Sequence, residues 1–152
     1  MRARDIMEKL KTEEEKEWFA EAMTAVILAD KMVAKNEMRP IEDVFKYLQP
    51  TKREELTACL KKREMAADLP EAPQFENREF AFKILSYYVG VTASDGNITP
   101  VEEEILEIIQ QKLGFHEKDL QGLLSEWRKL MQSKKQFEDA IHEIQKNALE
   151  KK

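Results

Sequence analysis

The chain has 152 residues, 42% hydrophobic and 36% charged, which fits one domain that can bury most of its apolar surface. Its formal net charge of −5 argues against nucleic-acid binding, which depends on clustered Lys and Arg, and the single cysteine, Cys59, excludes an internal disulfide. The chain starts without an apolar signal core, and its longest apolar run, residues 25–29, is too short to span a bilayer, so we expect a cytoplasmic protein.

The first half of the predicted domain covers residues 12–66. Thr12 and Glu15 have the spacing of a capping box, in which each residue bonds the backbone of the other at a helix start. The apolar residues that follow recur at intervals of three and four positions, as they do on the buried face of a helix. We expect this helix to end near Ala29.

A second helix is predicted from about residue 35 or 40 to residue 48. Pro40 is awkward unless the helix starts there, because a proline beyond the first turn removes a backbone hydrogen bond. Thr51 and Glu54 form another capping-box pattern, which predicts the start of a third helix.

Residues 68–76 contain two prolines and separate the two halves. The second half covers residues 77–131 and begins with a helix over about 77–93. This helix is apolar nearly all round, a pattern typical of a buried position, so we expect it to be the central, most buried helix of the domain.

The next helix has consistent signals at both ends. Thr99 is a good N-cap, Pro100 suits the first helical position, and Glu102 completes a capping box. Gly114 can adopt the left-handed conformation that ends many helices. The sequence therefore predicts a helix from residue 100 to residue 113.

Two further helices are predicted, over about 117–131 and 134–149. The last has an apolar face made of Phe137, Ile141, Ile144 and Ala148. Such an amphipathic helix could dock on its own domain or on a partner helix. Because no segment shows the alternation typical of a strand, the predicted fold class is all-α, as a single helical domain over residues 1–152.

Two acidic phrases lie at corresponding places in the two halves, each after an apolar helical run. Each contains an Asp, a β-branched apolar residue three positions later and a Glu seven positions later. The pairs are Asp30 with Glu37 and Asp95 with Glu102, and their separation is 95 − 30 = 65 residues. The sequence thus predicts two pseudo-symmetric helical repeats.

The second phrase has the residue types of a divalent-cation site. Asp95 is predicted at a helix C-terminus, among carbonyls that lack intrahelical partners. Asn97 and Glu102 or Glu103 add further oxygens, and Ca²⁺ and Mg²⁺ prefer ligands of this kind. We therefore predict a cation site with Asp95 as its principal ligand.

The first phrase would make a weaker counterpart. Lys31 and Lys35 could neutralise Asp30 and Glu37 and so reduce the need for a cation. An alternative interpretation needs no metal in either phrase. Asp favours turns and Glu at this spacing caps a helix, so both turns could be purely structural.

The two phrases, residues 29–33 and 94–98, each with a Glu four residues after the branched residue, resemble those of the TerB family, which is named for bacterial tellurite resistance. Lys31 stands where that family usually has glycine. The resemblance implies an all-helical fold of about seven helices with pseudo-symmetric halves. It also implies an acidic surface for divalent-cation binding and a role in stress-response complexes near the inner membrane.

The sequence shows no arrangement of residues that is typical of catalysis. The sequence shows no nucleophile beside a base and no glycine-rich phosphate loop. We expect a non-enzymatic stress-response binding protein that could coordinate Ca, Mg or Zn, with a protein partner such as a membrane-associated complex, and neither nucleic-acid binding nor membrane insertion. The competing expectation is a metal-free helical adaptor or scaffold.

Overall fold

A computed structural model of the chain describes residues 2–29, 41–75, 77–93 and 97–150. Within these ranges the protein is all-helical and no residue forms a strand, which confirms the predicted fold class. Residues 41–45 are helical. The other helices are α1 (Ala3–Lys9), α2 (Glu13–Ala29), α4 (Pro50–Lys62), α5 (Arg78–Ala93), α6 (Pro100–Leu113) and α7 (Glu117–Glu150).

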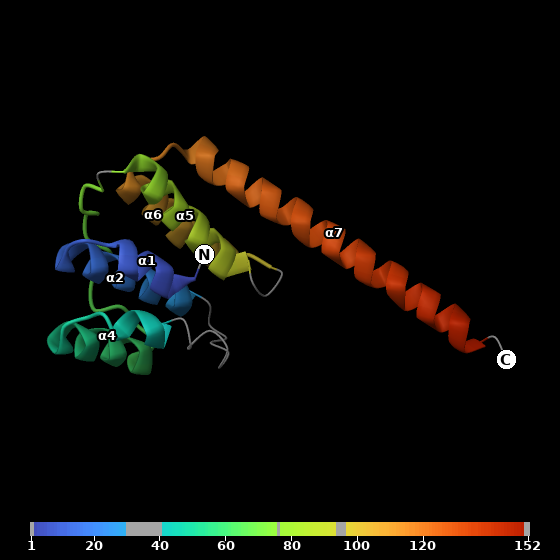
Figure 1. The fold of residues 1–152 in the computed structure, drawn as a ribbon, viewed down its shortest axis with the longest axis horizontal. Coiled ribbons are helices and arrows are strands. Elements are labelled where there is room, and N and C mark those ends of the chain that lie inside the picture. Colours follow the sequence, from blue (N-terminus) through green and yellow to red (C-terminus); the bar gives the residue numbers. More distant parts are fainter. Residues whose placement is uncertain (1, 30–40, 76, 94–96, 151–152) are drawn as a thin grey trace.

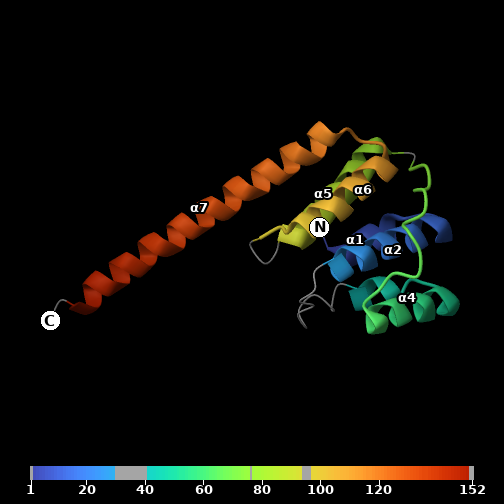
Figure 2. The same cartoon turned by 180° about the vertical axis from the view of Figure 1, so that it is seen from behind.

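The helices form a body and a rod (Figure 1). In the body, α2 contacts α4, α5 and α6, and α5 also packs along α6. Helix α7 contacts α5 and α6 near its start and then runs away from the body, so that its C-terminal end lies far from the other helices in both views (Figures 1 and 2).

The body is held together by one hydrophobic cluster to which α1, α2, α5 and α6 all contribute. At its centre the rings of Phe19 and Tyr88 stack with 5.3 Å between their centroids, and both residues are fully buried. Helix α2 has nine buried residues and α5 has seven. The prediction that α5 would be the most buried helix is therefore wrong, although α2 and α5 each pack against three other helices.

Most of the predicted helix ends are confirmed. Thr12 and Glu15 form the expected capping box, and so do Thr99 and Glu102, with Pro100 at the first helical position. Gly114 has a φ of 79° and ends α6 in the left-handed conformation. Local hydrogen bonding explains these successes, since each signal acts within one turn of its own helix.

Two helix starts differ from the prediction. Helix α1 was not expected, because seven residues are too few to show a helical period, yet its Ile6 and Met7 are fully buried. Helix α4 begins at Pro50 with Gln49 as N-cap, so the capping box predicted for Thr51 is wrong. A proline at the first helical position has a suitable φ and loses no hydrogen bond, which places the start before Thr51.

The two helices predicted over 117–131 and 134–149 are one continuous helix, α7. The residues between the predicted helices are Gln132 and Ser133, and neither stops a helix as Pro or Gly would. The segment 68–76, predicted as a separator, is non-helical over its described residues and packs on the body. There Trp18 donates a 2.9 Å hydrogen bond to the carbonyl of Pro70.

Candidate binding surface

Three of the six predicted cation ligands, Asp30, Glu37 and Asp95, lie outside the described residues. The other three are Asn97, Glu102 and Glu103. In the described part of the chain, no three His, Cys, Asp or Glu side chains come together as a metal site requires.

Glu102 closes the N-terminus of α6. Its Oε1 accepts a 3.1 Å hydrogen bond from the backbone N–H of Thr99, and its own N–H donates to Thr99 Oγ1 at 3.2 Å. The residue is buried, with only 2% of its surface exposed. Helix capping, which is the metal-free interpretation of the sequence, therefore accounts for this carboxylate.

Glu103 ties α6 to the base of α7. Its Oε1 accepts from Gln121 Nε2 and its Oε2 pairs with the guanidinium of Arg128, each at 3.4 Å. Both oxygens thus have partners on α7. The described donors alone do not supply the six or more oxygens that Ca²⁺ takes, and the cation site stays a prediction that depends on Asp95.

The most unusual surface of the molecule is the outer part of α7. Every residue from 132 to 150 is exposed. The large apolar side chains with high exposed fractions on this helix are Leu130 (56%), Phe137 (67%), Ile141 (48%), Ile144 (64%) and Leu149 (72%). Contiguous exposed apolar side chains mark interaction sites in proteins that are otherwise well packed.

Most of these residues follow a regular repeat. Positions 127, 130, 134, 137, 141, 144 and 148 alternate in steps of three and four, which is the heptad spacing of helices that pair side by side. We call these seven positions the seam. They carry Trp127, Leu130, Lys134, Phe137, Ile141, Ile144 and Ala148.

The seam begins where the body ends. Leu120 and Leu124, one turn and more before it, are fully buried against the body. Trp127 is half-buried and lies over Gly90 of α5, where an added Cβ would come within 3.2 Å of the indole ring. Glycine at this position lets α7 approach α5 closely, and the seam then continues beyond α5 into solvent.

Charges on the outer part of α7 are segregated. Residues 128–135 hold four cationic side chains and no acidic one: Arg128, Lys129, Lys134 and Lys135. Residues 136–143 hold three carboxylates and no Lys or Arg: Glu138, Asp139 and Glu143. This rod thus has a basic block next to the body and an acidic block after it.

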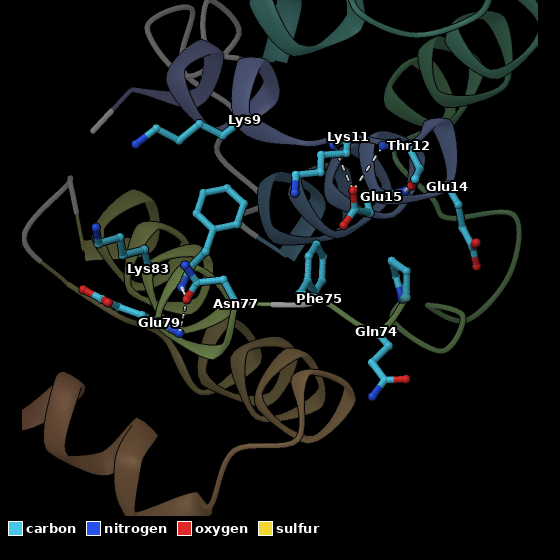
Figure 3. A pocket seen from close by; sticks show the side chains of 12 residues that line it. Lys9, Lys11, Thr12, Glu14, Glu15, Gln74, Phe75, Asn77, Glu79 and Lys83 are labelled. Atoms are coloured by element: carbon cyan, nitrogen blue, oxygen red, sulfur yellow. Dashed lines mark hydrogen bonds between the residues drawn. The ribbon is translucent and has the colours of Figure 1, made fainter.

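A second candidate surface is a cavity of about 520 Å³ between the start of α2 and the start of α5 (Figure 3). Glu15 and Asn77 line it and already cap these helices. The cavity has three lysines and three glutamates around Phe75 and Phe80, so its charges favour no ion of one sign. The seam is therefore the better candidate for a binding surface.

No family model, curated protein or solved structure matches the chain. None of the described helices is both long enough and apolar enough to cross a membrane. The sequence analysis found the apolar face of residues 134–149 but placed Trp127 and Leu130 in a separate helix over residues 117–131. The unbroken three-and-four spacing across residues 130–137 was the signal that joins them.

Proposed function

We propose that this protein is a non-enzymatic helical adaptor whose binding element is the exposed seam of α7. The observation that carries the proposal is the exposure of Leu130, Phe137, Ile141 and Ile144 along one face of a single helix. A helix that lays such a face against an apolar surface is a common mode of protein recognition.

The energetics favour a covered seam. Complete burial of one Phe, Leu or Ile side chain contributes ~1.5–3 kcal/mol, and four such side chains are exposed here. Residues 132–150 of α7 are also exposed throughout, whereas tertiary packing supplies most of the stability of helices in proteins. A partner that covers the seam would offset both deficits.

The finer expectations from the TerB resemblance belong to this proposal as well. They are the two pseudo-symmetric repeats, the cytoplasmic stress-response role near a membrane complex and the cation at Asp95, and their support is the pair of acidic phrases. If Asp95 supplies the missing oxygens, millimolar Ca²⁺, Mg²⁺ or Zn²⁺ will raise the melting temperature, because a ligand of the native state stabilises it. An unchanged melting temperature with all three ions would contradict the cation site.

The seam is tested by capture with matched variants of the full chain. Ile141→Glu places a carboxylate in the seam, and His142→Glu places the same group one residue along on the outer face. We expect the wild-type chain and His142→Glu to retain the same proteins from an extract of the source cells supplemented with untagged chain. Ile141→Glu should lose them. Equal retention by all three baits, or none, would refute the proposed function.

A further inference from the structure

We infer that the partner of the seam is a second copy of this chain, paired antiparallel so that the basic block of each α7 lies beside the acidic block of the other. This inference rests on the proposed function and deepens it by naming the partner. It is carried by the order of charges along α7, which the apolar face alone does not determine.

The heptad spacing sets the kind of contact. Seven positions, from 127 to 148, alternate in steps of three and four, and side chains at this spacing interlock with those of one similar helix rather than with a flat surface. Lys134 is the single charged residue among them. A charged residue at one seam position weakens a helix pair but fixes its register, and an acidic neighbour on the partner would offset the cost of Lys134.

The charge blocks determine the direction of pairing. In a parallel pair, residues 128–135 of the two copies would lie together and bring four cations against four, and the acidic blocks would also meet. In an antiparallel pair each basic block meets residues 136–143, with Glu138, Asp139 and Glu143. Opposite charges across an interface favour one arrangement and like charges exclude the other.

The same blocks fix the register. When residue 128 faces 143 and residue 135 faces 136, each pair sums to 271, and the twofold axis lies between positions 135 and 136. In this register Leu130 of one copy packs on Ile141 of the other. Lys134 lies at the level of residue 137 of the partner, next to its Glu138.

In this register residues 130–141 of the two copies face one another, and this part of the seam is exposed. The rod extends away from the body in both views (Figures 1 and 2). In an antiparallel pair the second body therefore lies towards the other end of the paired helices. The seam stays accessible along residues 130–148, where every position except Met131 is exposed.

Distances between spin labels test both the partner and its direction. We would label Leu149→Cys or Gln136→Cys in the full chain with Cys59→Ala, because Cys59 is the single native thiol. Residue 149 faces the level of 271 − 149 = 122, an offset of 27 residues or about 40 Å at 1.5 Å per residue. Residue 136 is offset by one residue from its counterpart.

We expect a distance of about 40 Å for the label at 149 and a short distance for the label at 136. Adding Ile141→Glu should abolish both signals and adding His142→Glu should leave them. Short distances at both sites would show a parallel pair, with about 10 Å between helix axes, and would overturn the antiparallel arrangement. The absence of any intermolecular signal in the wild-type background would overturn the second copy as partner. The capture experiment, which detects any protein bound by the seam, would then test the adaptor function by itself.

Discussion

Tyr88 shows how single residues hold the body together. Its hydroxyl donates a 2.7 Å hydrogen bond to the carbonyl of Phe19, which joins α5 to α2 in the middle of the core. Complete burial raises the pKa of Tyr88 well above its usual value, because the phenolate would lose its hydration. Burial also raises the pKa of the neighbouring Tyr87, to about 12.

These pKa shifts predict alkaline instability. An unfolded tyrosine has a pKa of about 10, and the folded values are higher, so the stabilisation is complete below about pH 10 and is lost as the pH rises above it. We expect the free energy of unfolding to fall above about pH 10, and to fall less in Tyr88→Phe than in the wild-type protein. At neutral pH the variant should lose ~0.5–1.5 kcal/mol, the usual contribution of one hydrogen bond.

Urea unfolding at a series of pH values measures this difference. The Tyr87→Phe variant separates the contributions of the two tyrosines, because the raised pKa of Tyr87 should also add to the alkaline decline. A decline for Tyr88→Phe that runs parallel to that of the wild-type protein up to the highest pH would show that Tyr88 does not cause the instability.

Arg78 fastens the start of α5 to the end of α6. Its guanidinium donates to the carbonyls of Leu113 at 2.7 Å and Gly114 at 3.3 Å, and it lies 4.3 Å from the centre of the Phe115 ring. These carbonyls are among those that lack intrahelical partners at a helix C-terminus. A planar fork is needed to reach both carbonyls and to stack on the ring.

We therefore predict that Arg78→Lys lowers the free energy of unfolding by ~0.5–1.5 kcal/mol although it keeps the charge, because the net contribution of one hydrogen bond is of this size. Arg2→Lys, at a side chain that is 71% exposed, should change it by less than ~0.5 kcal/mol. Chemical denaturation of both variants compares them directly. If Arg78→Lys is no less stable than Arg2→Lys, the assigned role of Arg78 is wrong.

At the scale of the element, the two ends of α7 lie in different environments. Leu120 and Leu124 are buried against the body, whereas residues 132–150 are all exposed. The outer part depends on its own backbone hydrogen bonds unless a partner covers the seam, and helical segments without tertiary packing are marginally stable.

Hydrogen exchange should separate the two parts. In Ile141→Glu we expect the amides of residues 132–150 to exchange much faster than those of residues 117–127, because local opening is easiest where few contacts are lost. In the wild-type protein at high concentration the outer amides should be protected. Equal exchange of the outer amides in both proteins would show that nothing covers this segment.

The features of these helices that could be predicted from the sequence are those that depend on neighbouring residues. Thr99, Glu102 and Gly114 act within one helical turn, and their signals could be read directly from the sequence. Helix α1 was missed because its burial depends on distant contacts of Ile6 and Met7 rather than on a visible period. The division of α7 was wrong because neither Gln132 nor Ser133, which lie between the two predicted helices, breaks a helix.

The binding surface was harder to predict than the helices for a physical reason. An apolar face at helical spacing is required both by a buried helix and by one that awaits a partner. Phe137 and Ile141 could therefore be recognised as one face, but their exposure depends on where the body ends. Trp127, which lies on Gly90, marks that end, and this contact joins residues 37 positions apart (127 − 90 = 37).

At the scale of the whole molecule, the protein is a packed body with a projecting rod, which is the outer part of α7. The buried core is complete without the outer part of α7, since its last buried member along the chain is Leu124. Apart from Trp127, which packs on Gly90 and also belongs to the seam, folding of the body and binding by the rod therefore use different residues. Variants such as Ile141→Glu should remove binding without unfolding the protein, because Ile141 is already 48% exposed.

The mass of the full chain in solution, followed by sedimentation equilibrium over a range of concentrations, tests the pairing of the rod most directly. One chain has a mass of 17.8 kDa. We expect the wild-type protein and His142→Glu to approach about twice this mass as concentration rises. Ile141→Glu should stay at the mass of one chain while its body still unfolds cooperatively. A wild-type protein that remains monomeric throughout, or an Ile141→Glu variant that doubles in mass like the wild type, would contradict the proposed pairing.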